Sequence, residues 1–147
     1  EYDFSASCNT RGVLFSCSGN YALTRSFRRT SDRATRHADG RQLIYIPVHA
    51  ANLRMGAGRA GWTALLHLGY TGRRNTQTAN EWSSFEKRLD PFLLANLSLQ
   101  KRFTKNHFEW GVKAKVENLL NASYQQILWR PMPGRNYSIT ILTGFLK

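Results

Sequence analysis

Apolar and polar residues alternate with a period of two along most of this chain, the pattern of β-strands whose two faces meet different surroundings. Seven segments carry the alternation, at residues 2–8, 13–24, 50–57, 62–71, 93–103, 108–117 and 137–145. Most of them reach about 9 to 12 residues, longer than the ~5–6 usual in soluble proteins and similar to a tilted strand that crosses a bilayer. The pattern therefore predicts an all-β protein of about seven long strands.

Short and long connections alternate strictly between these segments. The short ones are NTRG at 9–12, GRAG at 58–61 and TKNH at 104–107. The long ones are polar and rich in Arg, Asn, Gly and Pro, and they lie at 26–47, 72–91 and 119–136. Transmembrane β-barrels have this asymmetry, with short turns on the periplasmic side and long loops outside. We therefore expect an antiparallel meander whose long loops all leave from one end.

The alternation alone does not say whether the apolar face packs inward or meets lipid, since soluble and membrane barrels share it. The aromatic residues favour lipid, because they gather near the two ends of the strands. Those near the short turns are Phe15, Trp62, Phe103, Phe108, Trp110 and Phe145, and those near the long loops are Tyr21, Tyr70 and Tyr137. The two groups match the aromatic girdles of a membrane barrel. Two cations on the apolar parity, Lys101 and Arg25, lie at strand ends, where long side chains reach the interface.

Seven antiparallel strands do not close into an up-and-down barrel, because the first and last would run parallel, and open edges are not stable in lipid. The chain shows no signal peptide, which leaves a cytoplasmic protein, a mature chain or a fragment, and its start at Glu1 within an alternating segment favours a fragment. We therefore expect part of a transmembrane β-barrel, incomplete and open-edged. Apolar side chains of the later strands should lie exposed on one convex face: Leu97, Leu99, Val112, Ala114, Ile139 and Ile141.

Composition leaves a second class of protein open. The chain has 147 residues and a net charge of +12, which suggests a polyanionic partner. A soluble basic β-domain that binds anionic ligands or nucleic acid is therefore the alternative to a membrane barrel. The four histidines have no metal-ligand spacing, and no nucleophile motif or phosphate-binding loop occurs. We expect neither an enzyme nor a resident cofactor.

The two cysteines are predicted to be free. If 9–12 is a four-residue turn, Cys8 lies opposite Val13 and Cys17 opposite Phe4. The thiols are then about four residues apart along the ribbon, too far for a disulfide. Both are read as small apolar side chains.

Two stretches near the C-terminus resemble a known family. KVENLLNASYQ at 115–125, followed by PMPGRNYSITI at 131–141, resembles the C-terminal end of TonB-dependent outer-membrane receptors. Three further stretches match in order and spacing, RQLIYIPVHAANL at 41–53, GWTALLHLGYTGRRNT at 61–76 and LDPFLLANLSLQKRF at 89–103. The chain departs from the family in ending Phe145-Leu146-Lys147 rather than on the aromatic residue.

The resemblance implies that residues 1–147 are the C-terminal segment of a barrel of about 22 strands, whose plug domain is absent from this chain. Such receptors take up scarce nutrients, often ferric siderophores, haem or cobalamin. Their energy comes from an inner-membrane complex that acts through the plug. The implied location is the bacterial outer membrane, with lipid and lipopolysaccharide as partners and no nucleic acid.

Three groups of residues are candidate functional residues. On the polar parity, a row should line the lumen and contact the plug or shape a permeation path: Asn96, Ser98, Gln100, Arg102, Lys113, Lys115 and Glu117. In the closing strand, the alternation implied by the family as an assembly signal comprises Tyr137, Ile139, Ile141 and Phe145. In the external loops, basic residues expected to contact lipopolysaccharide phosphates, with solvation or a substrate role as alternatives, are Arg28, Arg29, Arg33, Arg36, Arg73 and Arg74.

The stretch at 116–120 looks helical at first, but we interpret it as the loop-side end of the sixth strand. Val116 continues the apolar row, and Asn118 and Asn121 suit a strand exit because asparagine tolerates turn conformations. Residues 122–136 are then the last external loop, and 137–145 the closing strand.

Overall fold

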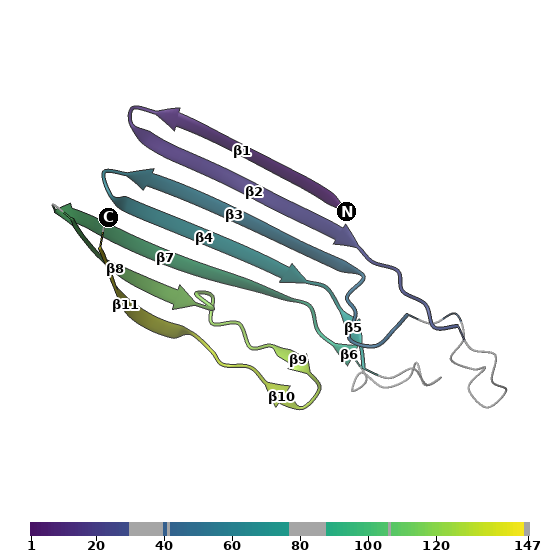
Figure 1. Ribbon diagram of the computed structural model, residues 1–147. Helices are drawn as coiled ribbons and strands as arrows, with labels where there is room; N and C mark the ends of the chain where they lie inside the picture. The colour runs from purple at the N-terminus through teal and green to yellow at the C-terminus, as the bar shows by residue number, and fades with distance from the viewer. Residues whose placement is uncertain (30–39, 41, 77–87, 106, 146–147) are drawn as a thin grey trace.

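The structure, a computed structural model, describes residues 1–29, 40, 42–76, 88–105 and 107–145. It confirms the all-β class and the antiparallel meander. Seven strands form one sheet in the order β1-β2-β3-β4-β7-β8-β11 (Figure 1). Their bounds are β1 Tyr2–Thr10, β2 Val13–Leu23, β3 His49–Arg59, β4 Trp62–Thr71, β7 Phe92–Lys105, β8 Phe108–Glu117 and β11 Asn136–Phe145.

The long connections leave from one end of the sheet and the short turns from the other (Figure 1). Two of these connections carry small ribbons that the sequence pattern did not predict. β5 (Arg74–Asn75) pairs with β6 (Arg88–Leu89), and β9 (Gln125–Ile127) pairs with β10 (Arg130–Pro131). The described residues contain no helix long and apolar enough to span a membrane.

The short turns are tighter than the four residues expected from the sequence. Arg11 and Gly12 form the first, and Ala60 and Gly61 the second, all with positive φ. Two consecutive residues with positive φ are typical of the type I′ turn, whose twist matches that of the flanking strands. The strands therefore extend closer to each turn than predicted.

The tighter first turn corrects the predicted cysteine register. Cys8 lies opposite Phe15, and Cys17 lies opposite Ala6, rather than opposite Val13 and Phe4. The two thiols are thus two positions apart along the ribbon, a diagonal separation of about 7–8 Å between α-carbons, which is still too long for a disulfide. Both cysteines are free, as predicted.

The register places most of the apolar residues of the seven strands on one face. A single row runs across the sheet through directly opposed residues, from Ala6 through Cys17, Met55, Leu66, Leu97 and Val116 to Tyr137. Because the side-chain period is two, every strand that joins this row turns its remaining alternate residues to the polar face. We call these two surfaces the apolar face and the polar face.

The sheet encloses almost no interior. Among the described residues the only buried hydrophobic side chains are Leu89 and Ala95. The predicted common face is confirmed, and its members are exposed: Leu97, Leu99, Val112, Ala114, Ile139 and Ile141. In the middle of β7, Asn96, Ser98 and Gln100 are half-buried, whereas Leu97 and Leu99 between them are exposed. A sheet bent toward its polar face crowds that face and spreads the other, which would produce this order; convexity itself stays a prediction.

Both edges of the sheet are open, as predicted. β1 pairs only with β2, and β11 pairs only with β8. Along an edge strand, alternate backbone N–H and C=O groups have no ladder partner. With seven antiparallel strands, β1 and β11 run in the same direction, so they do not join as an antiparallel pair.

Candidate functional site

The polar face brings together all the residues predicted to line a lumen. Ser98 lies opposite Lys115, Gln100 opposite Lys113 and Arg102 opposite Gly111, on adjacent strands β7 and β8. Asn96 and Glu117 extend the same face toward the loop end. Charges here are partly paired: Arg102 lies 3.6 Å from Glu109, and Lys115 forms an ion pair with Glu117. The result is a continuous hydrogen-bonding surface, whose role as a lumen stays a prediction.

A second part of the polar face was not singled out from the sequence. Asn52 donates from Nδ2 to Oδ1 of Asn20 over 3.0 Å, and Nε2 of His67 lies 3.3 Å from Oδ1 of Asn52. Together with Arg54 and Ser18 they line an open depression of about 360 Å³. Their shared parity on three different strands was the available signal, but only the register shows that they meet.

Aromatic and basic side chains meet at the turn end of the apolar face. Phe103 stacks on Trp110 with ring centroids 4.2 Å apart. Lys101 donates from Nζ to the carbonyl oxygen of Ala60 over 2.8 Å, and its Nζ lies 5.1 Å from the centroid of the Trp62 ring. The side chain of Lys101 therefore extends toward the turn, as expected for a cation at a strand end.

Two more cations share this end of the apolar face, Arg59 and Lys105. Arg59 lies opposite Trp62, which in turn lies opposite Lys101, and Lys105 is two residues further along β7. The sequence pattern missed both because the assumed four-residue turns ended the strands at 57 and 103. Arg25 lies beyond the end of β2 at Leu23.

At the loop end, Arg74 joins two external loops. It is 6% exposed, and its guanidinium donates to the carbonyl oxygens of Gln125, at 2.7 Å, and Gln126, at 3.2 Å. It also lies over the ring of Phe92, 5.2 Å from the centroid. Burial, partly offset by Tyr45, lowers the pKa of Arg74 below its ordinary value. Arg74 therefore fixes β9 to the start of the long connection that follows β4. We call this contact the Arg74 staple.

This burial corrects the prediction that Arg74 contacts lipopolysaccharide, because its guanidinium is enclosed by protein. Its neighbour Arg73 is exposed, as is Arg29, while Arg28 is half-buried. For these three residues lipopolysaccharide contact stays a prediction. Arg33 and Arg36 lie outside the described residues.

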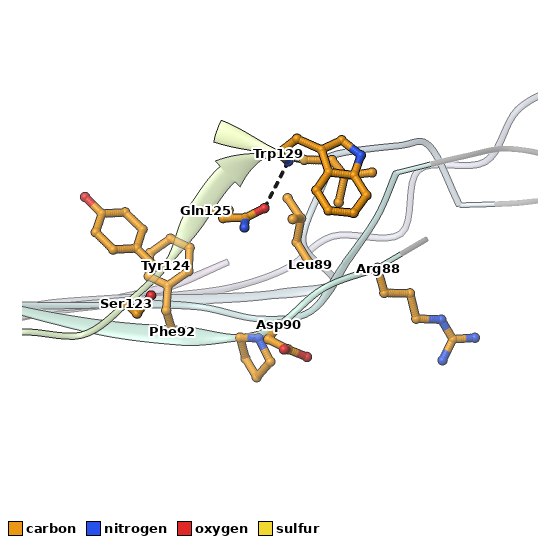
Figure 2. Close-up of a pocket in the computed structure, with 10 residues that line it drawn as sticks. Arg88, Leu89, Asp90, Phe92, Ser123, Tyr124, Gln125 and Trp129 are labelled. Carbon is orange, nitrogen blue, oxygen red and sulfur yellow. Dashed lines mark hydrogen bonds between the residues drawn. The ribbon is translucent and has the colours of Figure 1, made fainter. Parts of the chain in front are cut away.

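A pocket of about 320 Å³ lies beside this staple (Figure 2). The rings of Phe92 and Tyr124 form one part of its wall, with centroids 4.6 Å apart. Trp129, which is 74% exposed, is held at the pocket by a hydrogen bond from its backbone N–H to Oε1 of Gln125 over 3.1 Å. The volume of the pocket is at the lower end of the range for small-molecule sites.

Asn118 organises the exit from β8, where the chain ends its strand rather than starting a helix. Only 4% exposed and with φ 50°, it exchanges 2.9 Å hydrogen bonds with both backbone groups of Ala122. Its own N–H donates to Oδ1 of Asn96 over 2.9 Å. Asn96, predicted only to line a lumen, thus also anchors the last external loop.

The closing strand agrees with its predicted position. Tyr137, Ile139 and Ile141 lie on the apolar face at the open edge, strongly exposed, and the backbone of Phe145 pairs with that of Phe108. A role as an assembly signal stays a prediction. The described residues contain no group of three or more His, Cys, Asp or Glu side chains placed to hold a metal ion.

Comparison with known proteins identifies no relative: no family model matches the chain, and no curated protein matches it. The resemblance to TonB-dependent receptors therefore rests on the quoted sequence stretches and stays a prediction.

Replacing Arg74 with alanine should loosen the last external loop, because two hydrogen bonds from a charged group are lost. Such bonds contribute about 1.5–3 kcal/mol each, so amide exchange at Gln125–Ile127 should accelerate by tenfold or more. The Arg73→Ala substitution is the matched control and should leave that exchange unchanged. Equal exchange in both variants would show that the staple does not hold the loop.

Proposed function

We propose that this chain is the C-terminal β-barrel segment of a TonB-dependent receptor in the bacterial outer membrane. It would serve the uptake of a scarce nutrient such as siderophore-bound iron, haem or cobalamin, by binding and gated transport rather than catalysis. The observation that carries the proposal is the exposed apolar face, which extends over seven strands and ends in aromatic residues on both sides.

Large apolar side chains on this face are uncovered in the middle of the sheet as well as at its edges. Leu97 and Leu99, on a central strand, remain 39% and 45% exposed. Soluble monomers rarely expose a contiguous apolar patch of more than a few hundred Å². Lipid would cover such a face, and the polar face would then surround an aqueous or plugged interior.

The aromatic residues also follow a line oblique to the strands. Followed across the paired strands, Phe15 on β2 is level with Leu99 on β7, whereas Trp110 on β8 is level with Phe103 on β7. This shift of four residues is about 13 Å along a strand, and the four strand steps are about 19 Å across the sheet. The line of aromatic residues is therefore inclined by about 35° from the perpendicular to the strands. This angle is close to the tilt of strands in membrane barrels.

The tyrosines at the loop end shift in the same direction. Tyr21 and Tyr70 are level with Leu93 of β7 across the sheet, whereas Tyr137 is level with Leu97 of β7. Two roughly parallel oblique lines of aromatic residues fit two membrane boundaries crossed by tilted strands. A soluble core has no reason to place its aromatics in this way.

The open edges require further strands if the sheet lies in lipid, because unpaired backbone groups are costly there. The missing strands, the plug and the energy-coupling complex would belong to the rest of such a receptor. Reading the gene upstream of the codon for Glu1 tests this point: further alternating segments and a plug domain are expected. A start codon directly before Glu1 would contradict it.

Fractionation of the intact gene product tests the membrane assignment directly. The protein should remain with the outer membrane after an alkaline carbonate wash and should require detergent for extraction. Recovery in the soluble fraction without detergent would refute the proposal and favour a soluble basic domain, the class that the net charge of +12 leaves open. Growth of a receptor-deleted strain on single nutrients would then identify the ligand.

A further inference from the structure

Along the strands that the structure describes, positive charge on the apolar face is confined to the turn end, and no described carboxylate pairs with it. Within the described strands, the Lys and Arg residues of this face are Arg59, Lys101 and Lys105, all at the turn end. The carboxylates of the same strands lie on the polar face, at Asp3, Glu109 and Glu117. The ion pairs described above are also on the polar face. The three cations therefore face an environment outside the protein without a protein counter-ion.

Lys101 is held in place at the centre of this cluster. Its Nζ lies between two aromatic rings, 5.1 Å from the centroid of Trp62 and 5.5 Å from that of Phe103. The ammonium has three N–H donors, and the bond to Ala60 uses one of them. The turn beneath is fixed to β7 as well, since the N–H of Arg102 donates to the carbonyl oxygen of Gly61. An ordered cation with spare donors is thus presented at the rim of the apolar face.

The residues next to the cluster indicate what kind of anion it would meet. From Trp62 and Lys101 toward the middle of the sheet, the following row of this face contains Ala57, Ala64 and Leu99. A free phosphate or an acidic peptide would leave that apolar surface uncovered. A phospholipid would place its phosphate at the rim and its acyl chains over the apolar residues. At the loop end, the strands carry tyrosines on this face and no lysine or arginine.

We propose that Arg59, Lys101 and Lys105 form a site for the phosphate groups of anionic phospholipids in the leaflet at the turn side. The inference rests on the proposed membrane location and adds a lipid preference for one leaflet, the periplasmic one. Tryptophan and phenylalanine anchor this end at the interface, and the cations select the headgroup charge.

The lipid that surrounds the intact receptor in native membranes tests this site. The protein is extracted with its adjoining lipid by an amphipathic copolymer, and phosphatidylglycerol is quantified relative to the bulk membrane. In the Arg59→Gln/Lys105→Gln variant this enrichment should fall toward the bulk level, because each charge removed weakens the attraction to an anionic headgroup about fivefold. Neither side chain forms a hydrogen bond or ion pair within the described protein, so the substitutions should not impair folding. Adding Lys101→Gln should abolish the remaining enrichment.

Two controls separate headgroup binding from general charge. Replacing Arg54 and Lys113, on the polar face, with glutamine removes the same charge and should leave the enrichment unchanged. The charge-preserving variant Arg59→Lys/Lys105→Arg should also retain it. An unenriched wild-type protein, or an enrichment that survives in the glutamine variant, would overturn the lipid site while leaving the membrane assignment intact. A protein absent from the membrane fraction would instead refute the proposed function itself.

Discussion

Substituting Leu66 with lysine should prevent assembly of the proposed outer-membrane barrel. Leu66 lies in the middle of β4, between Met55 and Leu97 on the apolar face. If this face meets lipid, the lysine enters the bilayer near its midplane, at a cost of about 2–4 kcal/mol. The amount of assembled receptor, measured by its heat-modifiable migration in gels, should fall at least tenfold.

The adjacent residue supplies the matched control. Leu65 is also a leucine but lies on the polar face, opposite Ser98, and is 47% exposed. Leu65→Lys should assemble as well as the wild type, because its ammonium enters the polar interior. If the two lysine variants assemble equally, lipid does not cover the apolar face and the barrel proposal fails.

Substituting Asn118 with alanine should open the last external loop. The change removes both hydrogen bonds with Ala122 and leaves alanine at a positive φ, which it tolerates less well than asparagine does. Losing these contacts and adding this strain should cost about 3 kcal/mol of local stability. Trypsin should then cleave after the exposed Arg135 much faster than in the wild type.

Two further substitutions separate the causes. Asn118→Gly loses the same hydrogen bonds but adopts a positive φ without strain, so its cleavage should be faster than wild type yet slower than that of Asn118→Ala. Asn118→Asp keeps the acceptor for the N–H of Ala122 and should be the mildest change. Cleavage of the alanine variant at the wild-type rate would show that Asn118 does not hold the loop.

At the loop end of the sheet, the sequence did not predict which side chains are buried. Arg73 and Arg74 are neighbours of identical type, and nothing in the sequence separates an exposed arginine from a buried one at these positions. The difference depends on the carbonyl oxygens of Gln125 and Gln126, which lie about fifty residues away in the chain. The small β9–β10 ribbon was likewise missed, since two or three paired residues leave no visible alternation.

The sequence also left the length of the short turns undetermined. The position of each short connection was predicted correctly, but its length was overestimated, because residues that favour turns stand at both ends of NTRG and of GRAG. The positive φ values at Arg11, Gly12, Ala60 and Gly61 confine each turn to two residues. As a consequence Arg59 and Lys105 belong to strands, and the cation cluster became visible only in the structure.

The sequence by itself determined the seven long strands and the division of their side chains between two faces. It could do so because the period-two alternation is local, and a strand that keeps its parity keeps its face whatever its exact partner. Only the tertiary structure decided the register, the oblique lines of aromatic residues and the contacts of Arg74 and Asn118. These features depend on which residues lie opposite one another across hydrogen-bonded strands and between loops, and tight turns and distant hydrogen bonds set that alignment.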